Sequence, residues 1–309
     1  MTQIAAVLGV IAIALAWPAP ILLARAEWPA RAPATALALW QAIAVAGGLS
    51  MLGSLLAFAL SAAGTGLGGL LTLGPELWAG PIPEGFGVFH LAALTLAVVL
   101  GGHLLLNLAT TAVAAERQRR RQHRLLGLLS DPLPGPGRAR VLAHPAPVAY
   151  CVPGMRTATV LTDGLVALLE PRELAAVIAH ERMHLTGLHH LILLAFRAWH
   201  GALPWFPIAN RAERAVTLLT EYLADDAAAR RVGAATIRQA LARVGADGEP
   251  GAYSEHGGVA LDTEMLGRRL ARLGDEPRTE LDAGARGAIF AGSLLLVAVP
   301  TFLIALSVI

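Results

Sequence analysis

Four long runs without a charged residue constrain the fold of this chain more than any other feature. A helix needs about 20 apolar residues to cross a bilayer. Four stretches meet this length, at residues 4–24, 34–62, 87–115 and 287–309. With 55% hydrophobic and only 15% charged residues, the composition is too apolar for an ordinary soluble protein. We therefore predict an integral membrane protein, mostly α-helical, with four transmembrane helices.

A cleavable signal peptide is the alternative interpretation of the first run. Such a peptide has basic residues before its apolar core. No basic residue precedes Arg25, and Trp17, Pro18 and Pro20 interrupt the second half of the run. We therefore interpret this run as a retained membrane helix.

The long segment between the third and fourth runs predicts a separate domain. We expect three membrane helices within residues 1–115, a soluble domain over residues 116–286, and the fourth membrane helix over residues 287–309. Two β-like runs, at 147–152 and 157–164, predict a hairpin in a small sheet.

Other parts of this domain have simpler patterns. Residues 129–147 are rich in Pro and Gly and predict a linker, and residues 245–262 predict a loop. The stretch TEMLGRRLARL at 263–273 predicts a helix. The single cysteine, Cys151, argues against a disulfide framework and fits a reducing compartment.

The distribution of arginine predicts the orientation in the membrane. All 24 basic residues are Arg, and five of them lie between residues 117 and 124, whereas the loop at 63–86 has none. Basic flanks remain cytoplasmic, so we expect the domain in the cytoplasm and both termini outside. Nucleic-acid binding is the alternative for the basic cluster. Topology and anionic lipid already explain a basic run beside a bilayer, and we expect no direct nucleic-acid binding.

The run His180-Glu181-Arg182-Met183-His184 is the feature that carries chemistry. It spells H-E-x-x-H and follows an amphipathic stretch that begins at Pro171, a residue suited to the first helical position. Residues four apart share one face of a helix, so His180 and His184 can bind one metal ion. Glu181 then lies within reach of a water on that metal, which is the arrangement of zinc proteases.

A second helical pattern supplies the remaining groups. In Glu221-Tyr222-Leu223-Ala224-Asp225, two carboxylates lie four residues apart. A catalytic zinc has three protein ligands and one open position, and Glu221 can be the third ligand. Asp225 can accept the free N–H of a ligating histidine. We expect one zinc ion per chain.

The segment 188–209 is apolar but interrupted by charge and proline. We expect an amphipathic segment in the membrane interface, with Trp199, Trp205 and Phe206 at the level of the headgroups. Its histidines are expected to be packing or interfacial residues.

In the third run, His103 and Asn107 share one helix face, which is expected to pack against another span.

With these motifs the chain resembles a known group, the membrane-embedded zinc metallopeptidases of the BlaR/MecR antirepressor type. More distantly it is similar to the HtpX and CAAX-prenyl protease type. The resemblance is carried by AYCVPG (149–154), VLTDGLVALLEPRELAAVIAHERMH (160–184), WFP (205–207) and EYLAD (221–225). It covers the soluble segment, about half of the chain, while the spans match only in number and order.

The resemblance implies a gluzincin that cleaves a cytoplasmic protein, typically a winged-helix repressor. His180, His184 and Glu221 would be the ligands and Glu181 the base. A further group must stabilise the oxyanion, and the candidates are Tyr222, Tyr253, His256 and Arg269. For Arg269 we favour the alternative of an ordinary solvated arginine on its helix.

Two departures affect this comparison. Ala224-Asp225 stands where antirepressors usually have Cys-Asp, which is closer to the HtpX type. Antirepressors also carry an extracellular penicillin-binding sensor after the last span, and we expect this protein to lack one because the sequence ends at Ile309.

Three functions therefore compete. The first is a regulatory zinc endopeptidase that cuts a repressor, and the second is a quality-control protease for membrane proteins. The third is a non-proteolytic signalling protein with a structural zinc. The base Glu181 argues against the third, because a structural site has a closed fourth position and needs no base.

Overall fold

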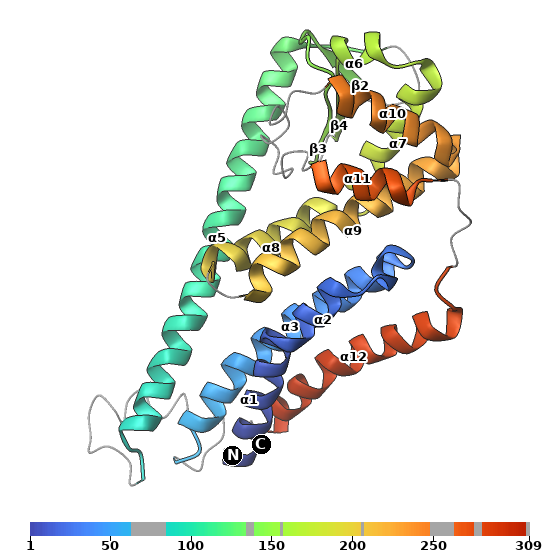
Figure 1. The fold of residues 1–309 in the computed structure, drawn as a ribbon. Coiled ribbons are helices and arrows are strands. Elements are labelled where there is room, and N and C mark those ends of the chain that lie inside the picture. The colour runs from blue at the N-terminus through green and yellow to red at the C-terminus, as the bar shows by residue number, and fades with distance from the viewer. Residues whose placement is uncertain are drawn as a thin grey trace.

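The computed structural model describes residues 1–62, 85–133, 139–154, 157–204, 207–247, 263–274 and 280–306. It is a long, mostly helical molecule with a small sheet at one end (Figure 1). The helices in the membrane part are α1 (Thr2–Ala16), α2 (Pro18–Arg25), the 3-10 turn η1 (Trp28–Ala30), α3 (Pro33–Ala59), α5 (Val88–Leu129) and α12 (Ala283–Leu306). Those of the other end are α6 (Asp163–Leu168), α7 (Pro171–Thr186), α8 (His189–Ala202), α9 (Pro207–Val232), α10 (Ala234–Asp247) and α11 (Thr263–Arg272).

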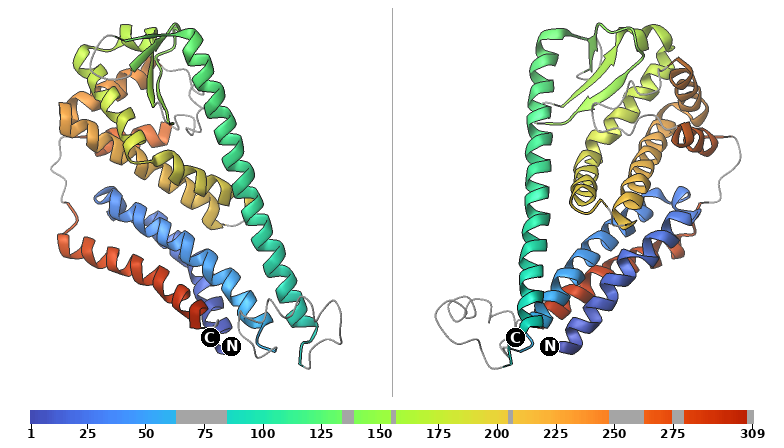
Figure 2. Two further views of the ribbon diagram at one scale, coloured as in Figure 1. Left: turned by 180° about the vertical axis from the view of Figure 1, so that it is seen from behind. Right: turned by 60° about the vertical axis from the view of Figure 1, so that its left-hand side comes forward.

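The four predicted spans appear as helices. Among the described residues, four helical stretches are long and apolar enough to cross a membrane, at 2–25, 33–59, 88–129 and 283–306. Their surfaces expose large apolar side chains: Ile13 is 70% exposed and Leu105 is 69% exposed. In water, such faces would be unfavourable, whereas lipid matches them. The N-terminus and C-terminus lie together at the end opposite the sheet (Figures 1 and 2).

The third span continues without a break into the following domain. Helix α5 runs for 42 residues along the full height of the molecule (Figure 1). No proline interrupts residues 88–129, and Glu116 pairs with Arg119 and Arg120 on the next turn. Such pairs support a helix in water. The expected boundary between residues 115 and 116 therefore lies inside one helix.

The small sheet has four strands in the order β1-β2-β4-β3. Strands β3 (Ala149–Val152) and β4 (Ala158–Thr162) are antiparallel, as the predicted hairpin requires. Strands β1 (Ser130–Pro132) and β2 (Ala139–Leu142) were not expected, because the Pro and Gly residues between them dominate the composition of 129–147. The linker expected there is thus partly a strand pair. Strand β3 forms an edge of the sheet among the described strands.

Helix α8 differs from the expected interfacial segment. Trp199 packs against Gly48 in the middle of α3, where any Cβ would lie 2.9 Å from its ring. His103 of α5 contacts the carbonyl oxygen of Ala202 at 3.0 Å, at the C-terminal end of α8. The polar face of α5 therefore meets α8, and not another span. Trp205 and Phe206 lie outside the described residues.

A shared core joins the two ends of the molecule. Trp40 of α3 is 1% exposed and belongs to one cluster with Phe196 of α8 and Val216 of α9. Burial of such side chains stabilises a structure by about 1.5–3 kcal/mol each. Helices α8 and α9 are therefore fixed to the membrane helices by apolar packing.

Candidate metal centre

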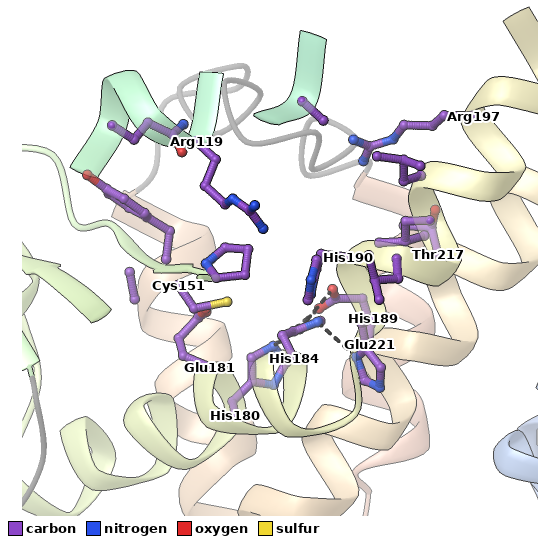
Figure 3. A pocket seen from close by; sticks show the side chains of 18 of the residues that line it. Arg119, Cys151, His180, Glu181, His184, His189, His190, Arg197, Thr217 and Glu221 are labelled. Carbon is purple, nitrogen blue, oxygen red and sulfur yellow. Dashed lines mark hydrogen bonds and ion pairs between the residues drawn. The ribbon is translucent and has the colours of Figure 1, made fainter. Parts of the chain in front are cut away.

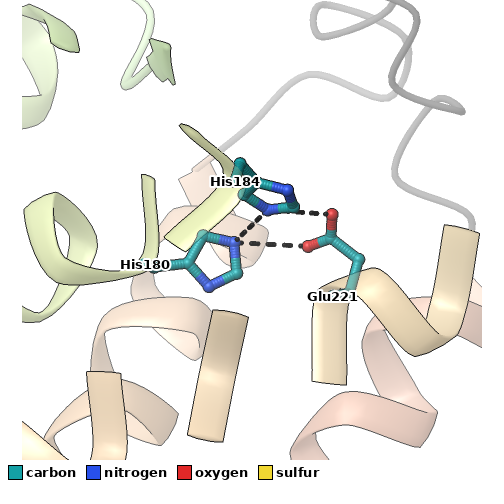
Figure 4. A group of neighbouring side chains, drawn as sticks. All are labelled: His180, His184 and Glu221. Atoms are coloured by element: carbon teal, nitrogen blue, oxygen red, sulfur yellow. Dashed lines mark hydrogen bonds and ion pairs between the residues drawn. The ribbon is translucent and has the colours of Figure 1, made fainter. Parts of the chain in front are cut away.

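Two histidines and one carboxylate converge where α7 meets α9. The Nε2 atoms of His180 and His184 lie 3.2 Å apart. Each also faces the Glu221 carboxylate, at 3.3 Å for His180 and 3.4 Å for His184 (Figure 4). The structure thus brings together the three residues that the sequence predicted as ligands.

Local sequence explains why the two helices can approach so closely. Helix α7 begins at Pro171, and the Glu173 carboxylate accepts the backbone N–H of Glu170 at 2.9 Å, which caps the helix. The contact with α9 is made by small residues: Ala176 and Ala179 pack against Ala228 in one buried cluster. Because these side chains are short, histidine and glutamate side chains from the two helices can reach the same point.

The donor set fits zinc. Atoms about 2.0–2.1 Å from a tetrahedral zinc lie about 3.3 Å from one another. The distance between the two Nε2 atoms, 3.2 Å, and the distance from each of them to one oxygen of Glu221, 3.3 and 3.4 Å, are close to this value. Two imidazoles and a carboxylate are also ligands that zinc prefers.

The electrostatics of the cluster differ among its three residues. Burial lowers the pKa of His184 to about 4, so its ring is neutral and has a free lone pair. Burial opposes the charge of Glu221, but the Arg269 guanidinium and the two histidines hold the pKa of that carboxyl well below its usual range. Burial lowers the pKa of His180, yet Asp225 and Glu221 outweigh it and raise the pKa to about 10. A metal ion therefore competes with a proton at His180.

Asp225 and Arg269 are buried next to His180 and Glu221. Asp225 Oδ1 lies 3.0 Å from His180 Nδ1, the ring nitrogen that faces away from the cluster. Arg269 of α11 donates two hydrogen bonds to Asp225, at 2.9 and 2.7 Å, and its Nη1 lies 2.9 Å from Glu221. At 6% exposure, Arg269 is no solvated helix arginine.

A pocket of about 1000 Å³ opens beside the cluster. Its wall includes Glu181, Cys151 of β3 and residues of α5 at the end of the membrane run (Figure 3). Burial, followed by the charge of Glu221, raises the pKa of Glu181. Burial and the neighbouring Glu181 raise the pKa of the Cys151 thiol, so it stays protonated and is not a nucleophile.

The structure places the remaining predicted residues differently. The guanidinium carbon of Arg272 lies over the Tyr222 ring, 4.6 Å from the centroid of that ring. Tyr222 belongs to the core shared with the membrane helices. It does not line the pocket. Tyr253 and His256 lie outside the described residues.

Sequence reasoning missed His189, which it treated as a packing residue. Its Nδ1 lies 3.0 Å from His184 Nδ1. Burial and the neighbouring His184 lower the pKa of His189 to about 4, so its ring is neutral. Residues five apart in the sequence do not lie on the same face of a helix. Helical spacing therefore could not predict that His189 contacts His184.

Replacing Arg269 by methionine should destabilise the metal-free protein. The change leaves two buried carboxylates, Glu221 and Asp225, without their cation, which costs about 3 kcal/mol. The midpoint of thermal unfolding should fall by several degrees, and excess zinc should restore part of the loss. Arg268→Met is the control, because Arg268 is exposed and its ion pair among the described residues is with Glu264 of its own helix. Equal effects of the two changes would contradict this assignment.

Comparison with known proteins supports the geometry. The model of peptidase family M48 matches residues 115–242, which is less than half of the chain and includes all of α7 and α9. Neither the search of curated proteins nor that of solved structures finds a match. The His180, His184 and Glu221 cluster lies within the matched segment, as a zinc metallopeptidase requires. Residues 115–242 are therefore a peptidase family M48 domain, and the protein is a zinc metallopeptidase with four candidate membrane helices.

Proposed function

We propose that the protein is a membrane-embedded zinc endopeptidase in which His180, His184 and Glu221 hold the metal and Glu181 is the general base. One observation carries this proposal. The Nε2 atoms of His180 and His184 lie 3.2 Å apart, and each faces one oxygen of the Glu221 carboxylate, at 3.3 and 3.4 Å, at the wall of a pocket that also contains Glu181. We further assign residues 116–286 to the peptidase domain, residues 1–115 to three spans and residues 287–309 to the fourth.

Each group of the chain has a defined task in this mechanism. Zinc, when bound, supplies a Lewis acid that makes water nucleophilic at neutral pH and polarises a peptide carbonyl. Glu181 accepts the proton of the attacking water and returns it to the leaving amine. Burial raises the pKa of Glu181, which makes its carboxylate a stronger base. Asp225 holds the His180 ring with Nε2 toward the ligand cluster.

Strand β3, which is an edge strand among the described strands, offers a place for the substrate backbone. Ala149, Tyr150 and Cys151 of this strand line the pocket, and Cys151 lies next to Glu181 (Figure 3). A peptide that adds to this edge as a further strand would pass directly beside the base. The side chains of the peptide would then decide specificity in the rest of the pocket.

A non-proteolytic role with a structural zinc has less support. A structural site closes its fourth position with protein. Here the cluster borders a pocket of about 1000 Å³, and a carboxylate with a raised pKa lies in its wall. These features serve a reaction and are of no use to a structural site.

The roles of ligand and base can be separated by two substitutions. His184→Ala should lose zinc, because a ligand is removed, and Glu181→Gln should keep zinc and lose cleavage, because only the base is removed. Metal analysis and a peptide-cleavage assay on the purified full-length protein measure the two properties. A zinc-loaded His184→Ala protein beside a zinc-free Glu181→Gln protein would show that the assignment is wrong.

The proposed topology has the peptidase domain in the cytoplasm and both termini outside. The Arg bias around 117–124 supports this orientation. Arg272 of α11 donates to the carbonyl oxygen of Ala30 at 2.8 Å, so the turn after the first span lies on the side of the peptidase domain.

Reporter fusions test the orientation. A reporter inserted near residue 245 should behave as a cytoplasmic protein, and one attached at residue 309 should behave as an exported protein. The physical reason is that basic flanks resist translocation. The opposite behaviour at either position would overturn the orientation.

The proposed substrate is a cytoplasmic protein, a winged-helix repressor as in the BlaR/MecR type. A membrane-protein substrate, as for a quality-control protease, is favoured by one observation: Ala112 and Ala115, at the end of the membrane run of α5, line the pocket.

The whole-cell proteome distinguishes these substrates. Cells with the unchanged protein should contain a repressor fragment that is missing from cells with Glu181→Gln, since the two differ only in the base. Equal expression of both forms is the control. Fragments of membrane proteins instead would favour quality control, and identical proteomes would contradict proteolysis in these cells.

A further inference from the structure

A second histidine lies directly behind one of the metal ligands. His189 is 2% exposed, and its ring meets that of His184 edge-on, with centroids 4.9 Å apart and planes at 87° (Figure 3). The two Nδ1 atoms are 3.0 Å apart. Two nitrogens at this distance share one proton, because two lone pairs or two N–H groups facing each other would repel.

The chain between α7 and α8 is shaped for this contact. Leu188 adopts a left-handed conformation with φ 52°, the one non-glycine residue with a positive φ in the described part of the chain. This conformation is unfavourable for leucine and is maintained only where the surroundings require it. Gly187 is required as well, because any Cβ there would lie 2.6 Å from His189 Nε2. The turn therefore returns the chain so that His189 lies against His184.

The tautomers follow from the ligand role of His184. Its Nε2 faces His180 and Glu221 and must offer a lone pair to a metal, so its proton is on Nδ1. That N–H then donates to the lone pair of His189 Nδ1, and His189 carries its own proton on Nε2. The Nδ1 atom of His180 likewise faces a neighbour, the Asp225 carboxylate, at 3.0 Å.

We propose that His189 is a positioning residue that fixes the tautomer and orientation of His184 and thereby strengthens zinc binding. The inference rests on the proposed ligand role of His184.

Two substitutions of His189 separate its acceptor from its volume. His189→Leu fills the space without an acceptor, while His189→Asn can place its amide oxygen near the former Nδ1. We expect His189→Leu to weaken zinc binding by about 10–100-fold, the usual loss for a removed partner of a ligating histidine. His189→Asn should bind zinc nearly as well as the unchanged protein. The measurement is competition with a chelator, on purified full-length protein.

The neighbouring His190 provides the control. It lines the same pocket, and its Nδ1 is buried without a hydrogen-bond partner among the described residues. His190→Leu should therefore leave zinc affinity unchanged. If His189→Leu and His189→Asn lose affinity equally, or neither loses any, the proposal is overturned.

A second variant covers the case in which His189→Leu does not fold. Gly187→Ala keeps the histidine but displaces its ring, and it should also weaken zinc binding; unchanged affinity would overturn the proposal. His184→Ala distinguishes a failure of the proposed ligand set from a failure of the role proposed for His189. If His184→Ala retains zinc, the proposed ligand set is wrong. If it loses zinc while His189→Leu retains it, only the role of His189 fails.

Discussion

Helix α9 contacts both the metal cluster and the membrane helices, and the rest of the structure depends on this double contact. One face carries Glu221 and Asp225 into the metal cluster, while the opposite face packs Val216 and Leu219 against membrane helices. A helix is rigid over this length, so the position of Glu221, the proposed third ligand, is fixed relative to these helices. The proposed active site therefore shares its packing with the membrane helices, and the pocket opens at the end of the third candidate span.

Burial of this site is possible only because its charges are paired. Taking carboxylates out of water is costly unless each one has a partner. Arg269 bridges Glu221 and Asp225, and Asp225 in turn lies beside His180. The same network selects the protonation states that a metal needs, an ionised Glu221 and a neutral His184. Stability and chemistry thus depend on the same few contacts.

Much of the fold and of the site was predictable from the sequence, and the features that were not predicted were missed for physical reasons. Hydropathy identified four spans because lipid requires about 20 apolar residues, and helical spacing identified the HExxH pair. The Arg269 contact spans 44 residues along the chain, and only tertiary packing determines it. His189 depends on the left-handed turn at Leu188, for which leucine gives no signal. Strands β1 and β2 were not predicted because Pro and Gly residues dominate the sequence between them.

The central claim is that two imidazoles and a carboxylate bind zinc here, and X-ray absorption at the zinc edge tests it most directly. The account predicts only nitrogen and oxygen neighbours at about 2.0–2.1 Å for the purified, zinc-loaded protein. The chain has a single cysteine, Cys151, and it lies in the same pocket. A sulfur neighbour at about 2.3 Å would mean that Cys151 binds the metal, which would contradict the proposed ligand set.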